Sequence, residues 1–234
     1  MEAVRINKYL SEAGVCSRRG ADRLIEEGRV TVNGNHALLG SVVTENDEVK
    51  VDDKVVGGKA KKVLIAFNKP RGIVCTTADP KSKDVNIVDY INYPERIFPL
   101  GRLDKESEGL IFLSNDGDIA NKIMKARNNH EKEYEVEVNK PFDEEFLIKM
   151  SEGVPILDTI TRKCTLKRTG QTTFNIILTQ GLNRQIRRMC EYFGYKVVKL
   201  RRIRIMNIRI GNLKTGTYRN ITDNEYDGLL KEFR

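Results

Sequence analysis

The sequence predicts an α+β fold with a small N-terminal α-β module and a larger domain built on a mostly antiparallel mixed sheet. Helix-like and strand-like segments mix without the regular strand–helix–strand rhythm that parallel sheets need. The stretch "GGKAKK" at residues 57–62 has linker composition and separates parts of different character. The length of 234 residues suits one large or two small domains. We therefore expect domains at 1–57 and 63–234, joined by a linker at 58–62.

The first module is predicted to hold two helices and two short strands. Apolar residues recur at helical spacing over residues 6–13. Ser17 is a favoured N-cap for a second helix that closes at Gly28. The stretch "VTVNG" at 30–34 predicts a strand and an Asn-Gly turn, and "DEVKV" at 47–51 predicts another strand.

The second domain carries strand and helix patterns that follow no single repeat. The segment at 131–138 alternates apolar and charged residues, which is typical of a strand with one buried face. Other strands are predicted at residues 63–67, 110–113, 173–179 and 197–210, with helices at 143–150 and 183–194 and a last helix that begins at the Thr222–Glu225 capping box.

The positive charge is concentrated in one part of the chain. The formal net charge is +8, and residues 162–214 contain fourteen Lys and Arg against one acid, Glu191. Residues 1–58 instead hold eight basic and ten acidic residues. A basic block interleaved with apolar residues indicates a structured surface for a polyanion, which in the cytoplasm is usually nucleic acid.

Several function classes lack their sequence signals. No GxxxxGK[ST] loop is present, and no GxGxxG follows a strand. Four dispersed cysteines and two histidines give no zinc-ligand spacing, so we expect free thiols and no metal site. No apolar run could span a bilayer, and the N-terminus lacks a secretory signal, which predicts a cytoplasmic protein. An enzyme of this kind would work without a cofactor.

The stretch "GRLDKESEGLIFLSNDG" at 101–117 places Asp104 between two cations and just before an apolar strand. Taken alone, this acid could be an ordinary turn residue paired with its neighbours. Three further features favour a site: Tyr134 on the apolar face of a predicted strand, "GLNRQIRRM" at 181–189, and "VVKLRRIRI" at 197–205.

Together these motifs resemble the pseudouridine synthases, in particular the branch that modifies ribosomal RNA. The segment "RINKYLSEAGVCSRRGADRLIEEGRVTVNG" is similar to the RNA-binding domain of the fourth small-subunit ribosomal protein. The stretch around Asp104 resembles the motif of the family's catalytic aspartate, and "KEYEV" and "GLNRQIRRM" match the next two motifs in order.

The resemblance implies a catalytic set of Asp104, Tyr134 and Arg187. Burial favours the protonated form of a carboxylate, so a cation beside it would keep it ionised. The resemblance gives this role to Arg187, and we expect its charge to matter more than its forked shape. Tyr134 would stack on the uracil, and Leu200 would either line the pocket or belong to the core.

The remaining expectations concern RNA. A flipped-out uridine would be isomerised without a cofactor, in large-subunit ribosomal RNA, by a monomeric protein. The alternatives are the same chemistry on small-subunit RNA or a transfer-RNA arm, and a non-catalytic RNA-binding or ribosome-assembly protein. Whether Asp104 attacks the sugar or acts as a base stays open. The residues expected to contact RNA are Arg5, Lys8, Arg18, Arg19, Arg23, Arg102, Lys105, Arg184 and Arg188.

Overall fold

The computed structural model describes residues 3–58, 60–76, 83–125 and 129–233. The chain divides into two compact units. Unit 1 consists of Met1–Val63 with Tyr93–Ile97 and Asn115–Gly117, and unit 2 contains the other segments. Residue 59 of the predicted linker lies outside the described residues.

Unit 1 has a small core between two helices and short strands. Ser17 caps α2 by accepting a hydrogen bond from the Gly20 amide, as predicted. The core contains Ile6 and Leu10 from α1 and Val30 from β2, all buried. The elements are β1 (Val4–Arg5), α1 (Ile6–Glu12), α2 (Arg18–Glu26), β2 (Val30–Val32), β3 (Asn35–His36), β4 (Val42–Val43), β5 (Val49–Val51) and β6 (Lys54–Val55). Strands β3-β2-β5-β6 form one sheet, and β1 pairs with β4.

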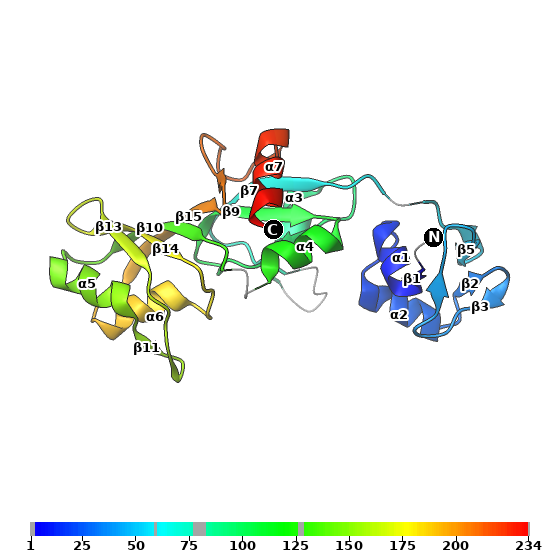
Figure 1. Ribbon diagram of the computed structural model, residues 1–234, viewed down its shortest axis with the longest axis horizontal. Helices are drawn as coiled ribbons and strands as arrows, with labels where there is room; N and C mark the ends of the chain where they lie inside the picture. The colour runs from blue at the N-terminus through cyan, green and yellow to red at the C-terminus, as the bar shows by residue number, and fades with distance from the viewer. Residues whose placement is uncertain (1–2, 59, 77–82, 126–128, 234) are drawn as a thin grey trace. The chain divides into compact units, whose positions relative to one another are not determined.

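Unit 2 is built on a nine-stranded sheet with the order β13-β14-β10-β15-β9-β7-β17, with β8 and β16 paired at its side (Figure 1). The pairs are antiparallel except for β9 with β15, so the predicted α+β class is confirmed. The strands are β7 (Leu64–Lys69), β8 (Phe98–Leu100), β9 (Glu108–Ser114), β10 (Lys132–Val138), β13 (Thr165–Arg168), β14 (Thr173–Leu178), β15 (Val197–Ile205), β16 (Ile208–Arg209) and β17 (Tyr218–Asn220).

Two apolar clusters cover the two halves of this sheet. One joins α5 and α6 to β10 and β14 around Phe146, Phe174 and Met189. The other joins α4 and α7 to β7 and β9 around Phe112 and Leu229. The helices are α3 (Ile87–Ile91), α4 (Gly117–Met124), α5 (Glu144–Glu152), α6 (Gln185–Tyr192) and α7 (Asp223–Glu232), and a small hairpin pairs β11 (Pro155–Ile156) with β12 (Thr159–Ile160).

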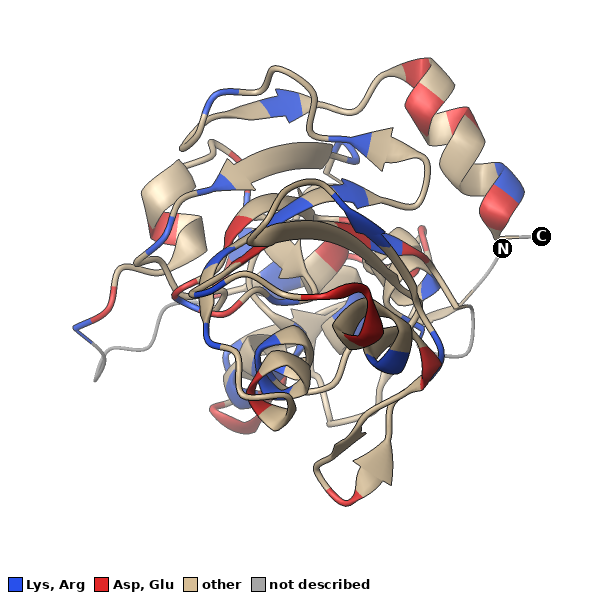
Figure 2. Cartoon of the chain, turned by 90° about the vertical axis from the view of Figure 1, so that its left-hand side faces the viewer, with Lys and Arg blue, Asp and Glu red and all other residues tan. Residues whose placement is uncertain are grey.

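The predicted caps of unit 2 form as expected. Asp143 accepts a hydrogen bond from the Phe146 amide at the start of α5. Thr222 and Glu225 form the predicted capping box of α7. The basic block lies on folded elements, since β13, α6, β15 and β16 all carry part of it. Figure 2 shows blue segments along the strands and helices of this unit, interspersed with red.

Burial sets the chemistry of the thiols. Cys75 and Cys190 are buried, and all four cysteines are free. Burial raises the pKa of the Cys190 thiol to about 12 and that of Cys164 to about 11, which makes the reactive thiolate scarce at neutral pH. No helix in the described ranges has the length and apolarity to cross a membrane.

The parallel junction of β9 and β15 depends on a glycine. Gly109 pairs with Arg202 and has a φ of +108°. A Cβ atom here would lie 2.6 Å from the backbone nitrogen of Arg202 and closer still to its carbonyl oxygen. Only a residue without a side chain therefore lets the two strands approach.

We predict that Gly109→Ala lowers the free energy of unfolding by at least ~2 kcal/mol, because the methyl group meets backbone atoms and the φ is strained. Gly211→Ala is the matched control: it has a φ of +54° but open space around it. It should cost only about 1 kcal/mol. Urea denaturation of both variants measures the two free energies of unfolding. Equal losses of free energy would mean that the close contact of residue 109 with the Arg202 backbone does not determine stability.

Candidate active site

Asp104 lies in a tight turn between β8 and β9. The Ser107 amide donates to the Asp104 carbonyl oxygen at 3.0 Å, which closes the turn. The Gly72 amide donates to the Lys105 carbonyl oxygen at 2.8 Å and ties the turn to the end of β7. The Asp104 side chain is 29 % exposed. Its carboxylate is therefore held on a fixed backbone and can still be reached from outside.

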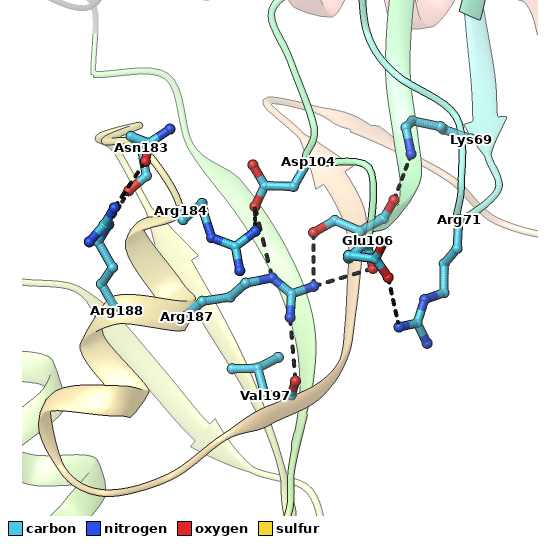
Figure 3. Close-up of polar contacts among 10 residues, drawn as sticks. Lys69, Arg71, Asp104, Glu106, Asn183, Arg184, Arg187, Arg188 and Val197 are labelled. Carbon is cyan, nitrogen blue, oxygen red and sulfur yellow. Dashed lines mark hydrogen bonds and ion pairs between the residues drawn. The ribbon is translucent and has the colours of Figure 1, made fainter. Parts of the chain in front are cut away.

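Arg187 reaches this turn from α6 (Figure 3). Its Nε lies 3.8 Å from Asp104 Oδ2, which is an ion-pair distance. Its Nη2 donates to the Glu106 carbonyl oxygen at 3.2 Å and to Ser107 Oγ at 3.3 Å. Its Nη1 donates to the Val197 carbonyl oxygen on β15 at 3.3 Å. One guanidinium thus connects the turn with both α6 and β15.

The electrostatics of Arg187 follow from its burial. Its side chain is 8 % exposed. Burial lowers the pKa of Arg187, repulsion from Arg184 lowers it further, and Asp104 acts in the opposite direction. Its Nε is buried without a hydrogen-bond partner among the described residues, so it remains available to the Asp104 carboxylate. An arginine keeps its charge in such a place, which a lysine does less reliably.

Lys69 binds the same turn from the end of β7. It is the last residue of β7 and is fully buried. Its Nζ donates to the carbonyl oxygens of Ser107 at 2.8 Å and Pro70 at 2.9 Å. Burial lowers its pKa, although negative charge nearby, including Asp104, opposes this. Together Lys69 and Arg187 hold the turn mainly through backbone oxygens.

A pocket of about 730 Å³ opens beside Asp104. One side is formed by the sheet, and we call it the sheet wall; its residues are Lys132 and Tyr134 from β10, Leu178 from β14, and Leu200, Arg202 and Ile205 from β15. Exposed cations surround the opening of the pocket and form its rim; they are Arg102, Lys125, Arg162 and Arg184.

The structure brings the predicted central residues together. Asp104, Tyr134 and Leu200 all line the pocket, and Arg187 lies behind Asp104. Leu200 is buried, and it also packs in the core cluster of α5 and α6. Arg184 Nη1 stands 3.8 Å from Asp104 Oδ2. Asp104 therefore faces two guanidinium groups, one buried and one exposed.

The other predicted RNA-contacting residues are more dispersed. Lys105 pairs with Asp84 at 2.7 Å, and Arg188 turns back to the carbonyl and side-chain oxygens of Asn183. Arg102 is exposed at the pocket rim. The remaining five, Arg5, Lys8, Arg18, Arg19 and Arg23, lie in unit 1.

Sequence patterns did not indicate four residues of this site, Lys69, Ser107, Lys132 and Arg202. Lys69 and Ser107 position the turn, and Lys132 and Arg202 line the pocket. A lysine that ends an apolar strand directly before a proline is an available signal for Lys69. We expected the charge of Arg187 to matter more than its forked shape. This expectation needs revision, because the three hydrogen bonds of Arg187 to the turn and to β15 require the forked guanidinium group.

The comparisons with known proteins identify the class. The RNA pseudouridylate synthase family matches residues 63–192, and the S4 domain matches residues 4–49. The chain therefore belongs to the RNA pseudouridylate synthase family and is an enzyme acting on RNA.

Relatives match nearly the whole chain. It is 54 % identical over 231 residues to the dual-specificity RNA pseudouridine synthase RluF of Escherichia coli K12, covering 98 % of this chain and 79 % of the relative. It is 36 % identical over 232 residues to the ribosomal large subunit pseudouridine synthase B of Bacillus subtilis, with 96 % and 95 % covered. A crystal structure of a pseudouridylate synthase matches with a TM-score of 0.70 at 27 % identity, covering 97 % and 99 % of the two chains.

We predict that Arg187→Lys lowers the free energy of unfolding by about 2 kcal/mol or more, because an ammonium cannot reproduce the bonds to Val197, Glu106 and Ser107. Turnover should fall by about 10²-fold as Asp104 loses its fixed position. Thermal unfolding and single-turnover assays measure the two effects. Arg188→Lys, an arginine of the same helix outside this network, should change stability by less than ~0.5 kcal/mol. Wild-type stability and turnover in Arg187→Lys would contradict the role of the fork.

Proposed function

We propose that this protein isomerises uridine to pseudouridine in ribosomal RNA, and in large-subunit RNA in particular, with Asp104 as the catalytic carboxylate. The observation that carries the proposal is the position of Asp104 in an open pocket beside the buried Arg187 guanidinium. The Bacillus subtilis relative, named as a large-subunit synthase, supports the choice of RNA.

The reaction needs one carboxylate and no external energy source. The bond between C1′ and N1 of the uridine breaks, the base turns, and C5 bonds to C1′ before it loses its proton. A carboxylate can attack C1′ or take a proton from the sugar. Arg187 and Arg184 balance the negative charge of Asp104 as the RNA excludes water from the pocket, because opposite charges attract more strongly where water is excluded.

Tyr134 and Leu200 receive the base in this proposal. The target uridine cannot reach Asp104 while it is stacked in an RNA fold, so it must flip out at a cost of a few kcal/mol. Tyr134 offers its ring for stacking, and Leu200 gives an apolar wall. Contacts of the phosphates with the rim cations and with Lys105 and Arg188 offset the cost of flipping.

We further propose that the two predicted domains have separate roles. Residues 1–57 grip and place the RNA through their exposed cations, and residues 63–234 perform the chemistry. We propose a monomer in the cytoplasm, where ribosomal RNA is found. Small-subunit RNA or a transfer-RNA arm is the second candidate target, because the Escherichia coli relative is named for dual specificity. Family membership sets the non-catalytic alternative aside.

The target is tested by mapping pseudouridine across all cellular RNA with and without this protein. Loss of one or a few sites in large-subunit ribosomal RNA is expected when the protein is absent. Losses confined to small-subunit RNA or transfer RNA would replace the proposed target with the second candidate. An unchanged map would contradict the proposal altogether.

We predict that Asp104→Asn reduces pseudouridine formation by at least ~10³-fold, because the amide can neither attack C1′ nor accept a proton. RNA affinity should stay close to that of the wild type, since the shape of the side chain is kept. Tritium release from C5-labelled uridine in RNA measures turnover. Asp158→Asn, an exposed acid in the β11–β12 turn, controls for the change in net charge. Substantial turnover by Asp104→Asn would refute the assignment.

We predict that replacing Arg18, Arg19 and Arg23 with Gln in the full chain weakens RNA binding and flattens its salt dependence. Each lost phosphate contact should reduce the slope of log K against log salt by roughly 0.7–0.9. Turnover at saturating RNA should survive. Arg29→Gln is the control, because this arginine of the same unit is already paired with Asp52 at 2.6 Å and Glu27 at 3.0 Å. An unchanged slope in the triple variant would mean that unit 1 does not grip this RNA.

A further inference from the structure

Lys132 is a cation of the sheet wall without a carboxylate partner among the described residues. It stands two positions before Tyr134 on β10, so the two side chains share one face of the strand, and both line the pocket. Its Nζ donates to the His130 carbonyl oxygen at 3.2 Å. An ammonium has three donors. Two N–H groups of Lys132 therefore remain for a ligand in the pocket.

Arg202 adds a second positive charge to the same wall. It is 4 % exposed and lies opposite Tyr134 on the neighbouring strand, with its guanidinium carbon 5.9 Å from the ring centroid. Its Nη2 is buried without a hydrogen-bond partner in the described part of the chain. Burial, followed by repulsion from Arg202, lowers the pKa of Lys132 to about 8.

The nearest acid on β10 is already paired with other arginines. Glu133 points to the other face of the strand, where it binds Arg204 at 2.9 Å and Arg209 at 3.3 Å. Two uncompensated cations in a mostly buried wall are costly unless something else supplies negative charge or acceptor oxygens. Bound RNA can enter the pocket and supply these acceptor oxygens.

The depth of Lys132 decides which part of the nucleotide it meets. The phosphates of a flipped nucleotide stay with the RNA backbone, near the exposed cations of the rim. The base enters furthest and lies against the sheet wall beside the Tyr134 ring. A wall cation next to that ring therefore meets the oxygens of the base, and uracil has two, O2 and O4.

We propose that Lys132 binds a ring carbonyl oxygen of the flipped uracil and stabilises the negative charge that the base carries after its bond to the sugar breaks. This inference rests on the proposed function. When C1′–N1 breaks, the electron pair passes to N1 and spreads onto O2 and O4. C5 then gives an electron pair to C1′, and the C5 proton leaves to a base. Lys132 keeps its protons throughout and acts only through its charge.

The role of Lys132 is tested with Lys132→Met in the full chain. The uncharged side chain keeps the length of lysine, so thermal unfolding should stay near the wild type. The rate constant kcat for uridine in RNA should fall by about 10²–10³-fold. RNA affinity, measured for Lys132→Met in the Asp104→Asn background, should equal that of Asp104→Asn alone. Lys149→Met, an exposed lysine of α5, should leave kcat unchanged.

A substrate with a better leaving group separates this role from a merely structural one. Fluorine at C5 withdraws electrons, so the uracil anion of 5-fluorouridine needs less stabilisation. C5 of this base has no proton to lose once it bonds to C1′, so the product keeps its fluorine and adds water across the N1=C6 bond. Mass spectrometry of the digested RNA detects this added water under single-turnover conditions. Lys132→Met should therefore lose at least tenfold less activity on RNA with 5-fluorouridine at the target position. Equal losses on both RNAs would overturn the proposal.

The pH profile gives an independent readout. The titratable and charged groups that face the pocket with Lys132 are Asp104 and Arg102 from the β8–β9 segment, Lys125 after α4, His130 before β10, Tyr134 on β10, and Arg162, Arg184 and Arg202. If the ammonium form is required, kcat/KM of the wild type should fall as the pH rises through about 8, where Lys132 loses its proton. Lys132→Arg should move this fall to higher pH.

Different results would contradict the role of Lys132 and the proposed function. A wild-type protein that makes pseudouridine, together with a Lys132→Met variant of equal kcat, would overturn only the role of Lys132. A fall in kcat/KM at the same pH in Lys132→Arg would also overturn it, because another group would be titrating. A wild-type protein that makes no pseudouridine in any RNA would overturn the proposed function and the role of Lys132 with it.

Discussion

The parallel pairing of β9 with β15 is the contact on which the site depends. Only two residue pairs make it, Arg201 with Glu108 and Arg202 with Gly109, and Arg202 Nε adds a bond of 2.6 Å to the Leu110 carbonyl oxygen. Strand β9 begins directly after the Asp104 turn, and β15 carries half of the sheet wall. The junction therefore fixes the distance between the Asp104 carboxylate and the sheet wall, the surface proposed to receive the base.

The charges of the site are arranged by depth. Arg187 is buried and donates three hydrogen bonds to the turn and to β15 through its two Nη atoms. Its Nε therefore remains for Asp104. Arg184 approaches the same carboxylate from the surface. Two further cations, Lys132 and Arg202, stand in the wall with no acid assigned to them in the described residues. The pocket thus holds one carboxylate, the proposed catalytic group, in a positive surrounding, which suits a polyanion and a base that becomes negative during the proposed reaction.

Sequence patterns predicted the elements that carry strong local signals. Helices α2, α5 and α7 have side-chain caps, and Leu110–Leu113 form an unbroken apolar run within β9. Strand β8 has only three residues with a proline in the middle, and β13 is polar and half exposed, so neither stands out. Of the site, motif resemblance supplied Asp104, Tyr134 and Arg187. It could not supply the hydrogen bonds of Lys69 and Arg187 to carbonyl oxygens, because every residue has a carbonyl.

That dependence on carbonyl oxygens has an evolutionary consequence. Lys69 and Arg187 hold the turn mostly by its backbone, and the side chains of Lys105 and Glu106 form only exposed ion pairs with Asp84 and Arg71. Mutations at positions 105 and 106 can therefore alter the charge that the turn presents to RNA while the carboxylate beside them stays in place. A fold of this kind can drift toward a new target RNA in small steps, with its reaction preserved at every step.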